Sequence, residues 1–308
     1  MMSIKALMNL LPKFTTIVGE KWLRSNSHAM EKYISERLLW FKQLENDLSL
    51  LGKQVSERDL ILCYRSALCD CSQVQKAIYE VHGVAILSSI ATKTELHVPR
   101  DNSSNRNFDV RVNIQGFVIN AESKTRKDEF PFNLPSSGNF YAGSRPTLDP
   151  HDSSDLGIES TKHASDIKEI RNPESTVIRQ CLIEGLGQLP RDGCNIIIFG
   201  HIEGDRLNLE DALHGSVVVE VVRNLETKEY ATRWVRTPTG AFNVGSAGEP
   251  FLSLSAILWT RLLPSFNNEL IRAYKLYLNP NALHPLPNKV KTALEHFIKE
   301  RSSPEIRV

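Results

Sequence analysis

The chain has 308 residues, enough to bury one large core or two modest ones. Hydrophobic residues make up 41% and charged residues 24%, which is ordinary for a soluble globular protein, and the formal net charge of +1 provides no broad basic field for nucleic acid. A local basic groove remains compatible with that balance. No apolar run reaches the roughly 18 residues of a membrane span, and the amino terminus lacks a signal-peptide pattern, so we expect no membrane partner.

The number of cysteines and the absence of three common catalytic motifs argue against several classes of protein. Five cysteines, an odd count, predict reduced thiols and a cytoplasmic protein. Cys69-Asp-Cys71 has no second pair at zinc-ligand spacing, which argues against a zinc site. The chain has no GxxxxGK[ST] loop, GxSxG elbow or HExxH helix, which argues against a P-loop ATPase, a common α/β-hydrolase and a zincin.

The first 70 residues are predicted to be helical. Ser25 or Asn26 can cap a helix that runs to about Leu51 with an apolar stripe at helical spacing. Ser56, followed three residues later by Asp59, predicts the start of a second helix through residue 68. Stripes of this kind indicate packing, and we assign no chemistry to this region.

Residues 72–107 lead into the candidate site. A short helix is expected over 72–82, stopped by Gly83, and it carries Glu80 near its end. Residues 84–90 and 94–98 are predicted to be strand, as one bent strand or as a hairpin arm, and 99–107 form a polar loop.

Residues 108–124, FDVRVNIQGFVINAESK, predict a hairpin with a two-residue turn at Gln115-Gly116. That turn pairs Ile114 with Phe117 and leaves Asp109 opposite Glu122. Alternation then gives the hairpin one apolar face and one face that carries Asp109, Glu122 and Lys124. Opposed residues have Cβ atoms roughly 5 Å apart, so two carboxylates and an ammonium converge on one patch.

Two facing carboxylates repel each other unless a cation lies between them. Mg²⁺ is the natural cation, since it commonly takes one or two carboxylates together with substrate phosphate. Asp109 and Glu122 are therefore predicted metal ligands, with Mg²⁺ as the cofactor and Mn²⁺ as a substitute.

Beyond the hairpin, the sequence predicts a long insertion followed by further helices and strands. Residues 125–172 form a long polar insertion. It contains basic and aromatic residues of the kind that bind a nucleic-acid strand, namely Arg126, Lys127, Phe140, Tyr141 and Arg145. A flexible insertion without a binding function explains this composition equally well. A helix is expected from Asn172-Pro173 to about residue 189, then a buried strand over 194–201. Residues 216–222 and 229–235 predict a hairpin, and 251–263, 268–278 and 288–300 predict three helices.

An Asp at the end of one strand and Glu-x-Lys on the next resemble the PD-(D/E)XK nuclease superfamily, which has the restriction-endonuclease-like fold. The resemblance maps the two carboxylates to Asp109 and Glu122 and the lysine, which assists the attacking water, to Lys124; Phe108 stands where the family often has Pro. It also suggests an acid from the preceding helix, Glu80, and a polar residue from the following helix, Gln180 first and Gln188 second.

The element order over 72–201 (helix, three strands, helix, strand) matches that family's core. We therefore expect an α/β protein with a mixed sheet and an αβββαβ core flanked by N- and C-terminal helices. The predicted regions are 1–70 (helical), 71–236 (nuclease-like core with an insertion at 125–172) and 237–308 (helical). The resemblance covers about the middle 130 residues.

The implied activity is Mg²⁺-dependent hydrolysis of nucleic acid, with DNA as the expected substrate, RNA as an alternative and a homodimer or protein partner that controls activity. Restriction, mobile-element or phage-defence biology is suggested by analogy alone. One competing hypothesis is a non-catalytic assembly subunit that keeps the fold and works with a protein partner. Another is a metal-free structural hairpin, in which Lys124 bridges Glu122 and the insertion covers both.

Overall fold

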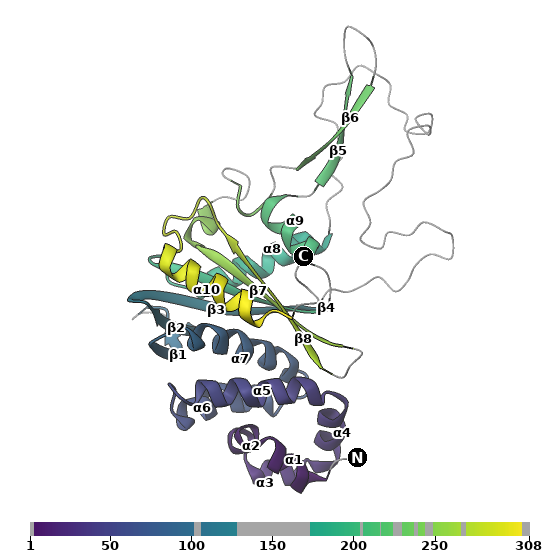
Figure 1. Ribbon diagram of the computed structural model, residues 1–308, viewed down its shortest axis with the longest axis vertical. Helices are drawn as coiled ribbons and strands as arrows, with labels where there is room; N and C mark the ends of the chain where they lie inside the picture. Colours follow the sequence, from purple (N-terminus) through teal and green to yellow (C-terminus); the bar gives the residue numbers. More distant parts are fainter. Residues whose placement is uncertain are drawn as a thin grey trace, which may run out of the picture.

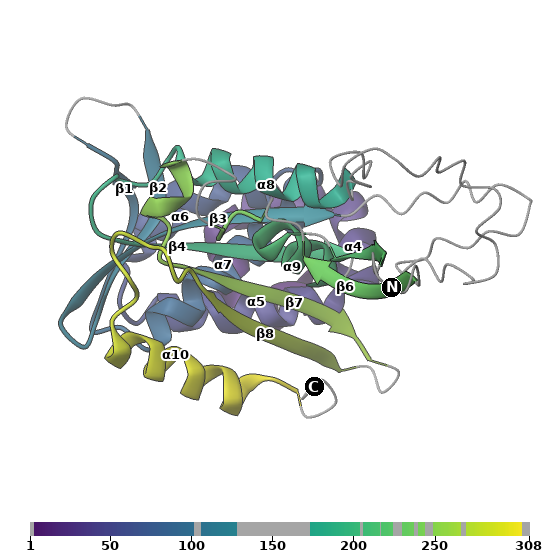
Figure 2. The same ribbon diagram turned by 90° about the horizontal axis from the view of Figure 1, so that it is seen from above.

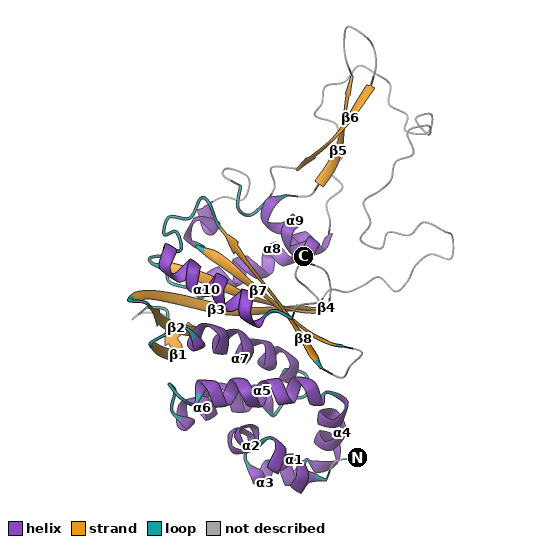
Figure 3. Ribbon diagram, in the orientation of Figure 1, coloured by secondary structure: helices purple, strands orange, loops and turns teal. Residues whose placement is uncertain are grey.

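The protein is an α/β fold built on a six-stranded mixed sheet with helices on both faces (Figures 1 and 3). The computed structural model describes residues 3–101, 106–127, 173–203, 206–215, 217–223, 230–236, 240–243, 249–265 and 269–303. The sheet order is β1-β2-β3-β4-β7-β8. Its strands are β1 (Lys93–Pro99), β2 (Asn107–Ile114), β3 (Phe117–Lys127), β4 (Cys194–Glu203), β7 (Ala256–Pro264) and β8 (Leu270–Leu278). β3, β4 and β7 run parallel, and the other neighbours are antiparallel.

One face of the sheet is covered by the amino-terminal helices, which stack in successive layers (Figure 1). α7 (Val74–Ser89) packs directly on the central strands, and α5 (Leu38–Leu51) packs on α7. The remaining helices of this side are α1 (Ile4–Leu10), α2 (Pro12–Val18), α3 (Glu20–Ser25), α4 (Ser27–Glu36) and α6 (Glu57–Leu68). The predicted helical character of this region is confirmed, although the helix expected to run to Leu51 is divided at Arg37.

The opposite face is covered by α8 (Pro173–Leu186), with α9 (Arg206–His214) and the short 3₁₀ helix η1 (Glu249–Ser253) beside it (Figure 2). α10 (Asn288–Arg301) packs along β8 at the sheet edge. β5 (Val217–Arg223) and β6 (Tyr230–Arg236) form the predicted hairpin, but as a separate two-stranded sheet. No helix in the described part of the chain has the length and apolar character that a membrane crossing requires.

The predicted order of helix, three strands, helix and strand is present as α7-β1-β2-β3-α8-β4. β4 is the buried strand expected from its continuous apolar run. Ile196 and Ile198 belong to the core on the α7 side, whereas Ile197 and Phe199 belong to the core on the α8 side. A strand buried on both faces needs apolar residues at every position, which explains why alternation is absent from this segment.

The prediction that Gly83 ends a helix and that 84–90 form a strand is wrong, since α7 continues to Ser89. α7 lies between α5 and the sheet, and every residue from Val81 to Ser88 is buried, so this half of the helix shows no amphipathic period. A Cβ on Gly83 would collide with the side chain of Ile198. Glycine therefore serves close helix-to-sheet packing here rather than helix termination.

The helices predicted over 251–263 and 268–278 are also wrong, because these residues form mostly β7 and β8; only the last predicted helix exists, as α10. β7 is buried on both faces, and a mostly apolar segment of this kind fits a buried helix and a buried strand equally well. The carboxyl-terminal region thus adds two strands to the main sheet as well as one flanking helix.

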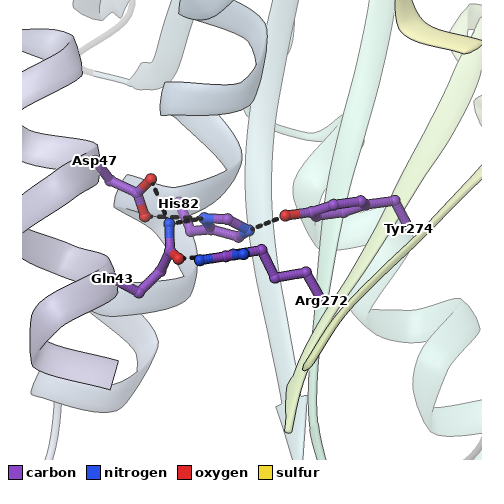
Figure 4. Close-up of polar contacts among 5 residues, drawn as sticks. All are labelled: Gln43, Asp47, His82, Arg272 and Tyr274. Carbon is purple, nitrogen blue, oxygen red and sulfur yellow. Dashed lines mark hydrogen bonds and ion pairs between the residues drawn. The ribbon is translucent and has the colours of Figure 1, made fainter. Parts of the chain in front are cut away.

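A buried polar network ties the amino-terminal helices to the far edge of the sheet (Figure 4). His82 of α7 contacts the carboxylate of Asp47 on α5 through Nδ1 at 2.8 Å and the hydroxyl of Tyr274 on β8 through Nε2 at 3.0 Å. Gln43 donates to Asp47 at 2.8 Å and accepts from Nε of Arg272 at 2.8 Å. His82 is 2% exposed and Asp47 6%, so the Asp-His-Tyr series is a structural clamp without access for a substrate.

Asp47→Ala should lower the free energy of unfolding by about 3 kcal/mol, because it removes a buried hydrogen-bond acceptor and leaves the donors of Gln43 and His82 unsatisfied. Urea unfolding monitored by circular dichroism measures this loss. Asn46→Ala is the matched control, since Asn46 is the exposed neighbour on the same helix and should change stability by less than about 0.5 kcal/mol. Equal effects of the two substitutions would contradict the clamp.

Candidate active site at the opening between β2 and β3

The predicted two-residue turn is present, and φ of 52° at Gln115 and 88° at Gly116 fits a type I′ turn. The predicted pairs Ile114–Phe117 and Val110–Ala121 are both present. Their register leaves Asp109 and Glu122 as the next residues on the two strands.

At Asp109 and Glu122, hydrogen bonds from backbone amides to side-chain carboxylates replace the backbone-to-backbone hydrogen bonds between the strands. The amide of Asp109 donates to Oε2 of Glu122 at 3.2 Å, and the amide of Ser123 donates to Oδ2 of Asp109 at 2.6 Å. Each carboxylate therefore lies at the end of the paired region, where the strands begin to separate and a side chain from another element can enter.

Lys124 forms an ion pair with Glu122 at 2.7 Å between Nζ and Oε1. Glu122 is only 2% exposed. Burial, and then the charge of Asp109, raise the pKa of Glu122 to about 7, although Lys124 acts in the opposite direction. A carboxyl group with this pKa is partly protonated near neutral pH unless a further cation stabilises its charge.

Glu80 reaches the same patch from α7. Burial raises the pKa of Glu80 well above its usual value, and the carboxylates of Asp109 and Glu122 raise it further. Burial also raises the pKa of Asp109, while the Ser123 amide and Lys124 lower it. Three acidic groups from three elements therefore lie close enough to oppose one another's ionisation.

Two residues of the site were not predicted from the sequence. His97 of β1 lies opposite Asp109, since its neighbours Leu96 and Val98 pair with Val110 and Phe108. One ligand atom each from Glu80, His97 and Asp109 lie within 4.8 Å of one another. The pairing of β1 with β2 brings His97 here, and the isolated HVP segment carries no such signal.

Tyr64 of α6 is the second unpredicted residue. It is 1% exposed, and its hydroxyl has no hydrogen-bond partner among the described residues. Its ring lies edge-on to His97 with the centroids 6.2 Å apart. Burial raises the pKa of Tyr64 well above its usual value, with further contributions from Glu80 and Asp109, which places the phenol beside the acidic cluster.

Gln180 does not belong to the site. Its side chain is exposed on α8 and donates to Glu184 at 3.4 Å. The helix is turned so that other residues face Lys124. A Cβ on Gly185 would lie 3.3 Å from Cε and Cγ of Lys124, and Lys124 contributes to the electrostatic environment of Cys181.

Gln188, the second choice, lies beside the site rather than in it. It lines an open hollow of about 550 Å³ together with Arg106, Asn107, Glu184 and Gly187. Arg100 and Arg106 both donate to the carbonyl of Gly187, at 2.7 and 3.3 Å, and so attach the end of β1 and the start of β2 to the end of α8.

Part of the predicted insertion is ordered strand, because β3 continues through Lys127. Arg126 therefore belongs to β3, two residues beyond Lys124. Phe140, Tyr141, Arg145 and the predicted cap Asn172 lie outside the described residues. The expectation that the insertion covers Glu122 and Lys124 concerns the same undescribed segment.

The donor set fits a divalent cation. Asp109, Glu122 and Glu80 offer hard carboxylate oxygens. Burial raises the pKa of all three, neighbouring carboxylates raise the pKa of Glu80 and Glu122 further, and a bound cation would stabilise the charged forms. Comparisons of the chain with protein-family models, curated proteins and solved structures find no match. The chemistry of these side chains is therefore the basis for inferring function.

The raised pKa of Glu122 predicts a specific dependence of stability on pH. The folded state holds a proton on Glu122 up to about pH 7, whereas the unfolded chain releases it near pH 4.5. The metal-free protein should therefore lose stability as the pH rises from about 4.5 to 7. Glu122→Gln, which keeps the shape of the protonated acid, should be more stable than the parent by about 1–3 kcal/mol at pH 8 and nearly equal to it at pH 4.5.

Urea unfolding in EDTA at the two pH values measures this difference. Glu184→Gln is the control, because Glu184 is exposed on α8. A Glu122→Gln variant that is less stable than the parent at pH 8 would show that Glu122 is a well-stabilised carboxylate and would remove this electrostatic argument for a cation.

Proposed function

We propose that this chain is a metal-dependent nuclease of the PD-(D/E)XK type that hydrolyses phosphodiester bonds of DNA. One observation carries the proposal: Glu80, Asp109 and Glu122, from a helix and two strands, converge at the opening of a hairpin where Lys124 is paired with Glu122. The topology around them, α7-β1-β2-β3-α8-β4, has the order expected for that fold.

Phosphodiester hydrolysis requires neutralisation of the phosphate charge and an activated water molecule. Asp109 and Glu122 would hold the divalent cation, with Glu80 as a further carboxylate, and the cation would supply charge neutralisation at the phosphate. The hydrogen bonds from the amides of Asp109 and Ser123 fix the orientation of the two strand carboxylates before any ligand arrives. Such preorganisation lowers the cost of reaching the reactive geometry.

Lys124 supplies the positive group of the site. Its Nζ is held by Oε1 of Glu122 at 2.7 Å, and its side chain is 18% exposed, so the ammonium is both positioned and accessible. In that position it can donate a hydrogen bond to the attacking water or to a phosphate oxygen as negative charge develops there.

The surroundings suit a phosphate backbone despite the nearly neutral net charge. Lys76, Lys124 and Arg126 all act electrostatically on Cys181 and so lie around one part of α8. Arg106 lines the hollow beside the start of β2. This local group of cations is of the kind that nucleic-acid binding requires, since phosphate contacts supply most of the sequence-independent affinity.

The metal-free structural hairpin also predicts the Lys124–Glu122 ion pair, so that contact does not separate the two hypotheses. Glu80 does separate them. Among the described residues its carboxylate has no hydrogen bond or ion pair, although burial raises its pKa. A hairpin stabilised only by a salt bridge gains nothing from a third carboxyl group, whereas a cation site does.

The chain should cleave supercoiled and linear DNA in the presence of Mg²⁺ or Mn²⁺ and stop when EDTA is added. Glu122→Gln and Lys124→Met should each lower the cleavage rate at least about 100-fold, because each removes a group that acts on the phosphate or on the attacking water. Agarose-gel assays beside circular dichroism spectra separate lost chemistry from lost folding.

Glu210→Gln and Lys275→Met are matched controls, since this second Glu–Lys pair also has a 2.7 Å contact and lies on α9 and β8. Cleavage that survives both site substitutions would refute the site assignment. Cleavage of RNA alone would change the substrate, and a parent chain without any cleavage would favour the assembly subunit with its protein partner.

Gly185→Ala should reduce cleavage about tenfold while leaving the fold intact, because the added methyl group would lie 3.3 Å from two carbons of Lys124 and shift its ammonium. Thr176→Ala, at an exposed position of the same helix, is the control. Full activity in Gly185→Ala would show that the position of Lys124 does not limit the reaction.

A further inference from the structure

Glu80, His97 and Asp109 form a mixed nitrogen and oxygen cluster on three different elements. One ligand atom from each lies within 4.8 Å of the other two, and all three side chains are half-buried. Ligand atoms around a single divalent ion lie roughly 3–4 Å apart, so small side-chain rotations would bring this cluster to coordination distance. Among the described residues, neither Glu80 nor His97 has a hydrogen-bond partner.

His97 has an unusual backbone. Its φ of 45° lies in the left-handed region, although it sits inside a strand whose neighbours keep a regular register with β2. Residues other than glycine adopt this conformation infrequently, and inside a strand such residues concentrate at functional sites.

Tyr64 gives an independent indication that a ligand belongs here. Its hydroxyl is buried and has no hydrogen-bond partner in the described residues, and its ring contacts the ring of His97. A buried hydroxyl without a partner is costly, so its presence beside the cluster indicates a group that is satisfied when the site is filled.

We propose that His97 is a metal ligand together with Glu80 and Asp109, and that its imidazole makes this site favour Mn²⁺ over Mg²⁺. Mg²⁺ prefers oxygen ligands alone, whereas imidazole nitrogen binds first-row transition metals. Mn²⁺ suits a set of two carboxylates and one histidine. The inference rests on the proposed function for the use of the ion, but ion binding is measured without nucleic acid.

Electron paramagnetic resonance of Mn²⁺ provides the test, since protein-bound ion loses the sharp signal of the free ion. The full chain is titrated with Mn²⁺, and Mg²⁺ is then added as a competitor. His97→Asn is the main variant, because Asn tolerates the left-handed backbone and replaces a nitrogen donor by an oxygen. His296→Asn is the control, as the His296 side chain on α10 is 69% exposed.

We expect His97→Asn to weaken Mn²⁺ binding at least about tenfold, since loss of even an outer-shell partner of a metal ligand costs roughly 10–100-fold. Mg²⁺ affinity should change less than about threefold, so that the preference for Mn²⁺ falls. The control should bind as the parent does. A parent that binds no Mn²⁺, or a variant that keeps the parent's preference, would overturn the proposal.

His97→Gly provides a second readout. Glycine adopts positive φ without strain, so the metal-free variant should melt at the same or a higher temperature than the parent. The rise in melting temperature on adding Mn²⁺ should be lost. A variant that keeps this rise would overturn the role of His97, whereas Mn²⁺ binding through His97 in a chain that cleaves no nucleic acid would support it and refute the nuclease proposal instead.

Discussion

The burial of three acidic groups beside one another is the constraint on which the rest of this site depends. Glu80, Asp109 and Glu122 come from three elements; burial raises the pKa of each, and repulsion between carboxylates raises the pKa of Glu80 and Glu122 further. Such a cluster costs stability and persists because the sheet and α7 position the groups regardless of that cost. Lys124 offsets only part of the repulsion, since the pKa of Glu122 stays raised even with the ammonium in contact.

The architecture supplies this positioning through a local separation of two strands. β2 and β3 are paired regularly up to Val110 and Ala121, and beyond that point their amides bond to side chains. The opening admits Glu80 from the helix that packs on the sheet. A continuous ladder would satisfy the backbone equally well but would leave no room for a third element at the two carboxylates.

The hairpin was predictable because its turn and register are local properties. Gln115-Gly116 fixes the turn, and counting along two strands then places Asp109 opposite Glu122. His97 and Tyr64 were not predictable, because they reach the site only through the β1–β2 pairing and the packing of α6. Gln180 was placed wrongly because the rotation of α8 about its axis depends on tertiary packing that helical spacing alone does not determine.

The contrast between local properties and tertiary packing also explains why some helices and strands were predicted wrongly. α7, β4 and β7 are all buried on more than one side, so none shows the period of its own secondary structure. Only β4 was bounded clearly enough by turn residues to be assigned correctly. Central elements are thus the hardest to predict, even though they contribute most to the core.

His82 and Glu80 lie two positions apart on α7, so their side chains leave the helix in nearly opposite directions. His82 is held between Asp47 and Tyr274, and this contact fixes the angle at which α7 is rotated about its own axis. One residue corresponds to a rotation of roughly 100°, which would carry Glu80 away from the sheet opening altogether. The polar network therefore prevents α7 from rotating about its axis. The direction in which the Glu80 side chain points thus depends on residues that lie on the opposite side of the helix.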